Sequence, residues 1–300
     1  MIWMMAAIYI LLPLALFYHL LKTDFGSKKV LVIDWLLLLM FIAFIFILGP
    51  WHIYSHYLRW LWPVLFILVS FFAFRRLGKL PAKGPKKSIK YKFSMGFSIV
   101  LFVYFGLLAA NGITGYILPD KDEAIELEFP MKDGVYAVGH GGANPSINYH
   151  NEYIPQQYAY DILQVNGLGL RGAGLSPTDL DKYKIYGTPL YSPCSGEVVA
   201  AVDEYDDIAP QESPDKKASP AGNHVILSCE GANIHLAHMK PGTVEVQEGD
   251  QVNTGDQLGE VGNTGNTTEP HLHIHAEKDG EGVPILFDGR FLKRNSLVFN

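Results

Sequence analysis

The sequence carries little charge for its length. Only 18% of its 300 residues are Asp, Glu, Lys or Arg, whereas 49% are hydrophobic. Soluble domains average about 25% charged residues, so the chain is too apolar for an ordinary soluble protein and we expect a membrane portion. It also has only two cysteines, 35 positions apart, and these are a poor basis for a zinc site made from thiolates.

The apolar residues are concentrated in four runs near the N-terminus. Each has roughly the ~20 residues that a bilayer core requires, and we expect residues 1–118 to form a four-helix transmembrane anchor followed by an acidic tether over 119–132. A cleaved signal peptide is the alternative for the first run, but no basic segment precedes it and no small-residue cleavage site lies before Lys22. The four runs are Ile2 to Leu21, Val30 to Leu48, Leu58 to Phe74 and Met95 to Leu118.

Charge is divided unevenly between the two parts of the chain. Twelve basic residues but only two acidic ones precede Pro119, whereas the rest has twelve basic and 28 acidic residues. The basic residues cluster between the first two runs and again in RRLGKLPAKGPKKSIKYK, while the intervening loop PWHIYSHY has none. The positive-inside rule therefore places both basic loops in the cytoplasm, and both termini outside. We interpret the basic stretch as a topology anchor, and the acidic C-terminal part disfavours nucleic acid as a partner.

Residues 133–300 are expected to form a mainly-β domain. Short β-type runs alternate there with Gly, Pro, Asn and Asp, and two long insertions, 166–185 and 203–222, are typical of functional walls or mobile segments. Cys194 and Cys229 both lie on predicted strands, so a disulfide is expected outside the cytoplasm, with two buried thiols as the alternative. The clearest predicted strands are GEVVAAV, NHVILSC, ANIHLAHM, TVEVQ, DQLGEVG and PHLHIHAE.

Three histidines alternate with apolar residues near the C-terminus. His271, His273 and His275 in PHLHIHAE would project from one side of a strand because successive side chains of a strand point to opposite faces. Three protonated imidazoles would repel one another there, and a metal ion removes the conflict because it binds the neutral ring. A single strand histidine is usually a surface residue, but three in alternation after a GNTG turn are much rarer, so this stretch alone leaves metal binding and a surface role equally open.

The same region resembles a known family. IHLAHMKPGTVEVQEGDQVNTGDQLGEVGNTGNTTEPHLHIHAE closely resembles the C-terminal core of the lysostaphin-type zinc metalloendopeptidases, which cut peptide cross-links in bacterial cell walls. GTPLYSPCSGEVVAAV and AGNHVILSC resemble the strands that precede this core. The resemblance extends roughly from Tyr136 to Glu277 and covers none of the membrane part. It implies an antiparallel β-sheet of the barrel-sandwich hybrid type and one Zn²⁺ ion per chain.

The resemblance also implies a ligand set. In the family, zinc is held by the His and Asp of an early H-x-x-x-D motif and by the second His of a late H-x-H, which maps to His273. QQYAYDI matches the early motif at Asp161, but Gln157 stands where the His is expected. We therefore expect that an insertion has displaced the ligand to His150, with His140 as the alternative.

The resemblance makes His271 and His238, in LAHMK, catalytic residues that do not bind the metal. Two imidazoles and one carboxylate would leave the fourth position of a catalytic zinc open to water, and zinc lowers the pKa of that water to about 7. One free imidazole could move the proton and another could stabilise the oxyanion. The sequence does not assign these two roles.

The other polar candidates are weaker. His275 is expected at the rim of the groove, with a role beside the metal ligands as the alternative. Asn144 and Asn148, in GGANPSINYH, would flank the groove and contact substrate. Four further histidines are interpreted as strand, surface or membrane-interface residues: His224, His235, His52 and His56.

The glycine-rich EGDQVNTGDQLGEVGNTGN also occurs, as a pattern, in lipoyl and biotinyl carriers and in the IIA domains of sugar phosphotransferases. A lipoyl carrier needs a modified Lys at the hairpin tip, where this chain has VNTGD. A phosphotransferase domain uses two histidines without Asp161 and works in the cytoplasm, contrary to the expected topology. Neither alternative explains the residues as well as a peptidase does.

The sequence thus predicts a membrane-anchored zinc metalloendopeptidase acting on stem peptides or cross-links of bacterial peptidoglycan. It would be a multi-pass protein of the bacterial cytoplasmic (inner) membrane, with its N-terminus and β domain on the extracytoplasmic side, and with the lipid bilayer and peptidoglycan as partners. The alternative is a catalytically inactive zinc-binding module of the same fold that recruits another cell-wall hydrolase. Gln157 supports this alternative, whereas the presence of Asp161, His238, His271 and His273 argues against it.

Overall fold

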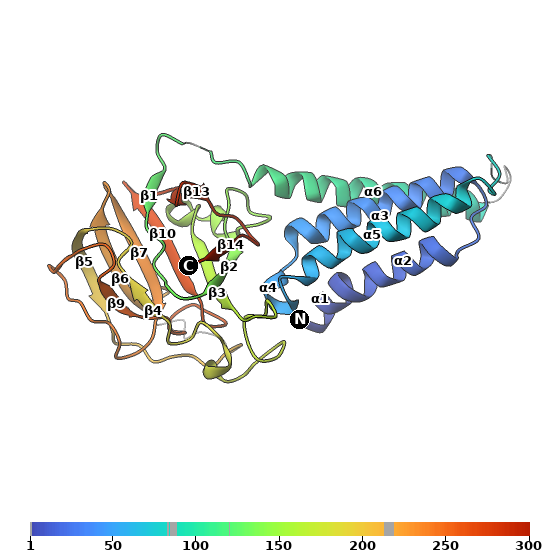
Figure 1. The fold of residues 1–300 in the computed structure, drawn as a ribbon. Helices are drawn as coiled ribbons and strands as arrows, with labels where there is room; N and C mark the ends of the chain where they lie inside the picture. The colour runs from blue at the N-terminus through green and yellow to red at the C-terminus, as the bar shows by residue number, and fades with distance from the viewer. Residues whose placement is uncertain (1, 83, 85–88, 120, 213–218) are drawn as a thin grey trace. The chain divides into compact units, whose positions relative to one another are not determined.

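The computed structural model describes residues 2–82, 84, 89–119, 121–212 and 219–300. The chain divides into two compact units (Figure 1). The first comprises residues 1–51 and 57–113 and is helical, and the second comprises residues 52–56 and 114–300 and contains all the strands.

Four helical segments of the first unit are long and apolar enough to cross a membrane, as the sequence predicts. A short helix, α4 (Trp51–Tyr54), follows the second of them. Lys83, Lys86 and Lys87 of the predicted basic loop lie outside the described residues. The four segments are Ile2–Lys22, built from α1 (Ile2–Ala6), the π-helical turn η1 (Ala7–Leu11) and α2 (Leu12–Lys22), then α3 (Lys28–Leu48), α5 (Leu58–Leu77) and α6 (Ile89–Thr114).

The helices pack through α3, which has the largest buried share of the four. Phe41 and Ile45 on α3 are fully buried, and the Trp35 indole Nε1 donates a 2.7 Å hydrogen bond to Ser70 Oγ on α5. Large apolar side chains point outward elsewhere, such as Ile67, which is 67% exposed. An apolar outer surface of this kind suits lipid, since a helix that is hydrophobic all round is normally buried or membrane-spanning.

The described residues of the second unit form fourteen strands, arranged in three sheets. They are β1 (Ile125–Leu127), β2 (Val135–His140), β3 (Tyr160–Val165), β4 (Pro189–Tyr191), β5 (Gly196–Val202), β6 (Asn223–Cys229), β7 (Ala232–Met239), β8 (Gln251–Val252), β9 (Gln257–Glu260), β10 (Leu272–Lys278), β11 (Glu281–Val283), β12 (Ile285–Phe287), β13 (Arg290–Phe291) and β14 (Leu297–Phe299). Three 3₁₀ turns lie between them, η2 (Tyr149–Glu152), η3 (Ile154–Gln156) and η4 (Leu180–Lys182).

The main sheet has nine strands and is antiparallel. Its order is β14-β2-β3-β10-β7-β6-β5-β8, with β11 beside β10. Because the path ends at β14 on one side and β8 on the other, the described residues form no closed barrel, and the barrel part of the expected hybrid is wrong. The smaller sheets are β1-β12-β13 and β4-β9, and among the strands of the described residues only β1 and β12 pair in parallel.

The core lies on one face of the main sheet. Leu272, Ile274 and Ala276 on β10 are almost fully buried in it, together with Ile234 and Leu236 on β7. Since side chains of a strand alternate, the residues between them, including His273 and His275, lie on the opposite face. Both predictions about this strand, its existence and its alternation, are therefore confirmed by the register of β10 with β7.

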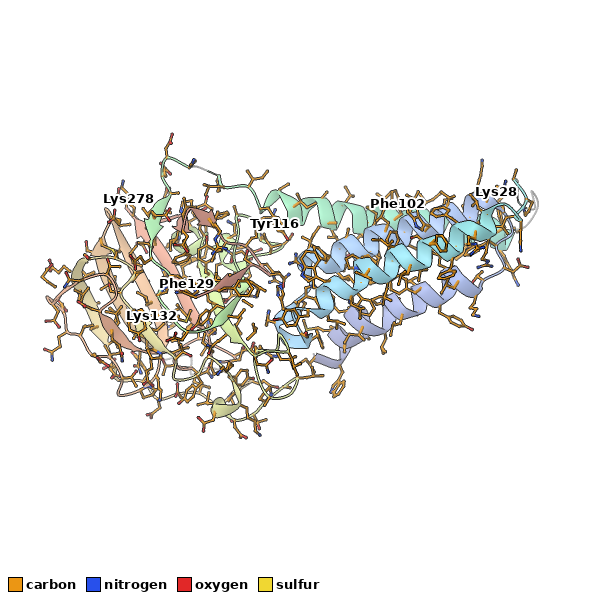
Figure 2. All side chains as sticks on the ribbon, in the orientation of Figure 1. Lys28, Phe102, Tyr116, Phe129, Lys132 and Lys278 are labelled. Carbon is orange, nitrogen blue, oxygen red and sulfur yellow. A yellow bond between two sulfur atoms is a disulfide. The ribbon has the colours of Figure 1, made fainter. Side chains whose placement is uncertain are left out.

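Part of the predicted tether belongs to the β unit instead. Ile125 on β1 pairs with Ile285 on β12, and Leu127 and Met131 are buried in the core. Phe129, labelled in Figure 2, packs with its ring centroid 5.3 Å from that of Tyr136. The apolar residues between the acidic ones thus pack against strands from the last part of the chain. The acidic composition of the segment alone did not predict this packing.

The segment TVEVQ is not a strand, contrary to the prediction. Its two valines, Val244 and Val246, pack against the core, and the Glu245 amide donates to the Leu258 carbonyl at 3.0 Å. The alternation correctly indicated that one side of this segment is buried. However, residues 243–247 do not pair continuously with a neighbouring strand.

Cys194 and Cys229 form the predicted disulfide, with their Cα atoms 6.3 Å apart. It joins the segment before β5 to the last residue of β6 and closes a loop of 35 positions. Such a cross-link stabilises a fold chiefly because it restricts the unfolded chain.

We predict that the double variant Cys194→Ser/Cys229→Ser loses about 3–4 kcal/mol of unfolding free energy in the β unit, as expected for a loop of this length. Amide hydrogen exchange of β6 and β7 in the full chain in detergent measures this loss. Wild-type protein held in reductant should match the variant. Unchanged exchange rates in the variant would show that the disulfide adds no stability.

Candidate metal centre

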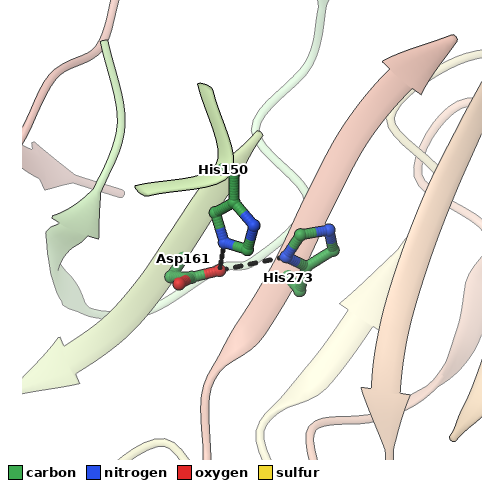
Figure 3. Close-up of side chains that lie close together, drawn as sticks. All are labelled: His150, Asp161 and His273. Atoms are coloured by element: carbon green, nitrogen blue, oxygen red, sulfur yellow. Dashed lines mark hydrogen bonds and ion pairs between the residues drawn. The ribbon is translucent and has the colours of Figure 1, made fainter. Parts of the chain in front are cut away.

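Asp161 and His273 face each other on neighbouring strands. In the register of β3 with β10, His273 is directly opposite Asp161, and opposite residues of an antiparallel pair share a face. His273 Nδ1 lies 3.0 Å from Asp161 Oδ1 (Figure 3). The sheet therefore brings together two side chains that are 112 positions apart in the sequence.

His150 completes a group of three ligand-type side chains. It belongs to the 3₁₀ turn η2, and its Nε2 lies 2.9 Å from the same Oδ1 of Asp161. Figure 3 shows both imidazoles converging on this carboxylate. The ligand atoms of all three residues lie within 4.8 Å of one another, and all three are buried. Two imidazoles and one carboxylate are the donor set of many catalytic zinc sites, so these residues fit the metal that the sequence predicts.

Asn148 holds the loop that carries His150. Its side chain is fully buried, and its Nδ2 donates to the carbonyls of Gly142 at 2.9 Å and Ala159 at 3.1 Å. Asn144 Oδ1 accepts from the Ser146 amide at 2.8 Å. The amides of both asparagines thus shape the loop, and neither residue lines the cavity beside the site.

Gln157 and His140 do not belong to the group of three, although His140 is directly opposite Asp161 in the register of β2 with β3. Gln157 Nε2 donates to the Gly282 carbonyl on β11 at 3.1 Å. The Arg294 guanidinium lies 2.8 Å from His140 Nδ1. Burial and then the charge of Arg294 lower the pKa of His140 to about 3. The geometry therefore favours His150 over His140 as the third ligand.

The two remaining predicted site residues, His238 and His271, hold their rings in similar ways. His238 Nδ1 lies 2.8 Å from the Thr264 carbonyl, and His271 Nδ1 lies 2.8 Å from the Glu269 carbonyl. A carbonyl only accepts, so each Nδ1 carries the proton and each Nε2 carries a lone pair in the neutral ring. The ring centroids are 4.8 Å apart, and His271 Nε2 lies 3.5 Å from Asp161 Oδ1.

His238 reaches this face because the backbone departs from strand geometry. The opposite partner of His273 on β7 is Ala237, so strict alternation would turn His238 into the core. Its φ is +64°, a left-handed value that non-glycine residues rarely adopt. The side chain that enters the core is Met239 instead. Strain of this kind is commonly found at functional sites.

The surroundings shift the pKa values of His271 and His238 in opposite directions. Burial lowers the pKa of His271, but the Asp161 carboxylate outweighs burial and the pKa is raised above its ordinary value. For His238, burial and the neighbouring His271 lower the pKa well below the ordinary value. The pKa of Asp161 itself is held well below its ordinary value, because His150 and His271 outweigh the effect of burial.

A cavity of about 230 Å³ opens beside Asp161 and His271. Its lining includes Tyr149, whose ring centroid lies 4.0 Å from that of His150. Burial and Asp161 raise the pKa of Tyr149 above its ordinary value, which keeps its hydroxyl protonated as a hydrogen-bond donor. Sequence reasoning missed Tyr149, although it is the direct neighbour of the proposed ligand.

Three histidines that we expected at the periphery are buried. His275 is only 5% exposed, and His52 and His56 are also buried within the β unit. His52 lines the cavity described above. The burial of His275 contradicts the expected rim position, whereas the membrane-interface position of His52 and His56 stays a prediction.

The β unit thus presents two imidazoles and a carboxylate that could hold a metal ion, with two further imidazoles beside them. Residues 179–285 match the sequence model of peptidase family M23, so the chain contains a peptidase M23 domain. The matched part includes His238, His271 and His273, whereas His150 and Asp161 precede it.

Several solved structures resemble parts of the chain. A Pseudomonas aeruginosa structure assigned to peptidase M23 is 26% identical over 34% of this chain and 38% of its own, with a TM-score of 0.26. A zinc-containing peptidase from Vibrio cholerae is 17% identical over 53% and 39%, with a TM-score of 0.31. Lysostaphin from Staphylococcus simulans is 22% identical over 46% and 45%, with a TM-score of 0.25. This chain therefore covers less than half the length of each.

We predict that His150→Asn weakens binding of the most tightly bound zinc ion by at least about 100-fold. Loss of a direct ligand should exceed the roughly 10–100-fold effect on affinity of residues that orient the ligands. His140→Asn is the matched control and should retain the ion. Zinc content of the full chain in detergent, measured after dialysis against a chelator series, provides the comparison. The reverse ranking of the two variants would make His140 the ligand.

Proposed function

We propose that the chain is a membrane-anchored zinc metalloendopeptidase that hydrolyses stem peptides or cross-links of bacterial peptidoglycan. The observation that carries this proposal is the convergence of His150 and His273 on Asp161, beside two further imidazoles whose Nδ1 atoms are held by backbone carbonyls. The M23 domain over residues 179–285 supports the same reaction class.

In this proposal His150, Asp161 and His273 hold Zn²⁺. The bound ion supplies a water molecule with a pKa of about 7 and polarises the scissile carbonyl. Asp161 also contributes a negative charge that partly compensates the cation, so the ion and its three ligands together would carry a single positive charge. The buried position of all three side chains limits competing water and strengthens their interaction with the ion.

His238 and His271 provide the proton chemistry. In the neutral state each Nε2 can accept the proton of the attacking water, and in the protonated state each can donate to the departing amine or to the developing oxyanion. The Thr264 and Glu269 carbonyls keep both rings oriented throughout. Tyr149 adds a hydroxyl at the same cavity, where it can bind the substrate carbonyl or carboxylate.

We further propose that the four apolar helices lie in the bacterial cytoplasmic membrane and that the β unit is on the extracytoplasmic side. The distribution of Lys and Arg between the loops supports this topology, and the Cys194–Cys229 disulfide suits an oxidising compartment. An anchor of this kind holds the enzyme near the wall, so a high local concentration can replace a high affinity for the substrate.

A non-catalytic module that recruits another cell-wall hydrolase is the second candidate function. It is favoured by Gln157, which stands at the position of a metal ligand in the resembled family and instead bonds the Gly282 carbonyl. Both candidates require zinc, so the metal alone does not distinguish them. Hydrolysis does.

We predict that the zinc-loaded full chain in detergent releases peptides from purified sacculi. His238→Gln and His271→Gln should each lower the rate by about 10²–10⁴-fold, the usual contribution of a general acid or base, and both should retain zinc. The matched control is His224→Gln, on a neighbouring strand of the same sheet, which should retain both zinc and activity. Released peptides are measured by mass spectrometry.

The outcome that separates the two candidate functions is a wild-type protein that binds zinc but cleaves no sacculus preparation. That result would contradict the hydrolase and support the recruiting module. Equal activity of His271→Gln and the wild type would instead contradict the proposed proton chemistry.

A further inference from the structure

A second group of ligand-type side chains lies on the same face of the main sheet. It consists of His235 on β7 and His275 and Glu277 on β10, and none of these residues takes part in the reaction proposed above. One ligand atom from each of the three lies within 4.8 Å of the others.

The strand register produces this second group. His275 is directly opposite His235, and the two rings stack with centroids 4.3 Å apart and planes at 13°. Glu277 follows two positions further along β10, so it shares their face. Its Oε2 lies 4.0 Å from His235 Nε2, which is too long for a hydrogen bond but suits two atoms that coordinate one ion between them.

Charge and access also suit a cation. Burial, then His224 and His273, lower the pKa of His235 to about 4, so its ring is neutral and can bind a metal near neutral pH. The side chains of His235 and Glu277 are 22% and 29% exposed. An ion can therefore enter from solvent, whereas the ligands of the first group are more deeply buried.

We propose that His235, His275 and Glu277 bind a second divalent cation. Two imidazole nitrogens and one carboxylate oxygen favour zinc or a neighbouring transition metal over calcium or magnesium, which prefer oxygen ligands. The existence of this site does not depend on the proposed hydrolase activity.

Binding of either ion should weaken binding of the other, and this consequence rests on the proposed first site. His273 Nε2 lies 3.0 Å from His275 Nδ1. When His273 holds the first ion through Nδ1, its proton is on Nε2 and is donated to His275 Nδ1. A second ion on His275 Nε2 would place a proton on Nδ1, and a second ion on Nδ1 would occupy the accepting lone pair. Either way the hydrogen bond between the rings is lost.

This linkage makes the second site a candidate regulator. The second ion should bind more weakly than the first and should disturb the orientation of His273 when zinc is abundant, because ligand imidazoles are oriented by the group that their other nitrogen bonds. Repulsion between two divalent ions acts in the same direction.

The test is the zinc stoichiometry of the full chain in detergent, stripped of metal and titrated with Zn²⁺ in a calorimeter. Wild type should bind two ions, and Glu277→Gln and His235→Asn should each bind one. Glu281→Gln, which removes a carboxylate on the adjacent strand β11, is the matched control and should bind two. A single ion in the wild type, or two ions in both site variants, would overturn the second site.

Asp161→Asn separates the two sites. This variant should lose the first ion and bind the second on the order of tenfold more tightly, which corresponds to the regained hydrogen bond between the two rings. Unchanged or weaker binding of the second ion in this variant would contradict the proposal that the two ions weaken each other's binding. Failure of the wild type to cleave sacculi, with the two-ion stoichiometry intact, would contradict only the proposed function.

Discussion

The register of β3 against β10 is the constraint on which the site depends. It places Asp161 opposite His273 and so creates the negative centre around which the imidazoles gather. A shift of one residue would turn every side chain of β10 to the other face of the sheet. The core residues Leu272 and Ile274 are fully buried, so hydrophobic burial enforces the same register that the proposed metal ligands need.

Crowding of histidines on one sheet face is possible because their rings have different surroundings. Backbone carbonyls fix the rings of His238 and His271, whereas His273 and His275 contact each other. Burial favours neutral rings, but at His271 the Asp161 carboxylate outweighs burial and raises the pKa above its ordinary value. The rings on this face therefore differ in how readily they accept a proton, although they all belong to one sheet.

Sequence patterns predicted local features and long apolar runs well. The four helices and the disulfide occur as predicted, and the alternation in PHLHIHAE identified the strand that carries His273. Predictions failed where a distant partner decides the outcome. Ile125 joins β12 across 160 positions, and TVEVQ packs on the core without a continuous strand partner. Closure of a sheet is likewise a property of its edges, and β14 and β8 do not meet.

The sequence by itself determined which residues could serve as ligands, because the ability to bind a metal depends on the type of side chain. Alternation along a strand also determines which neighbours share a face. Only the tertiary structure decided which distant side chains meet. His150 reaches Asp161 Oδ1 because buried Asn148 folds the loop that carries it, and His238 reaches the site through a left-handed backbone angle that alternation does not predict. Both outcomes depend on hydrogen bonds and packing between segments that are separated in the chain, which no local pattern encodes.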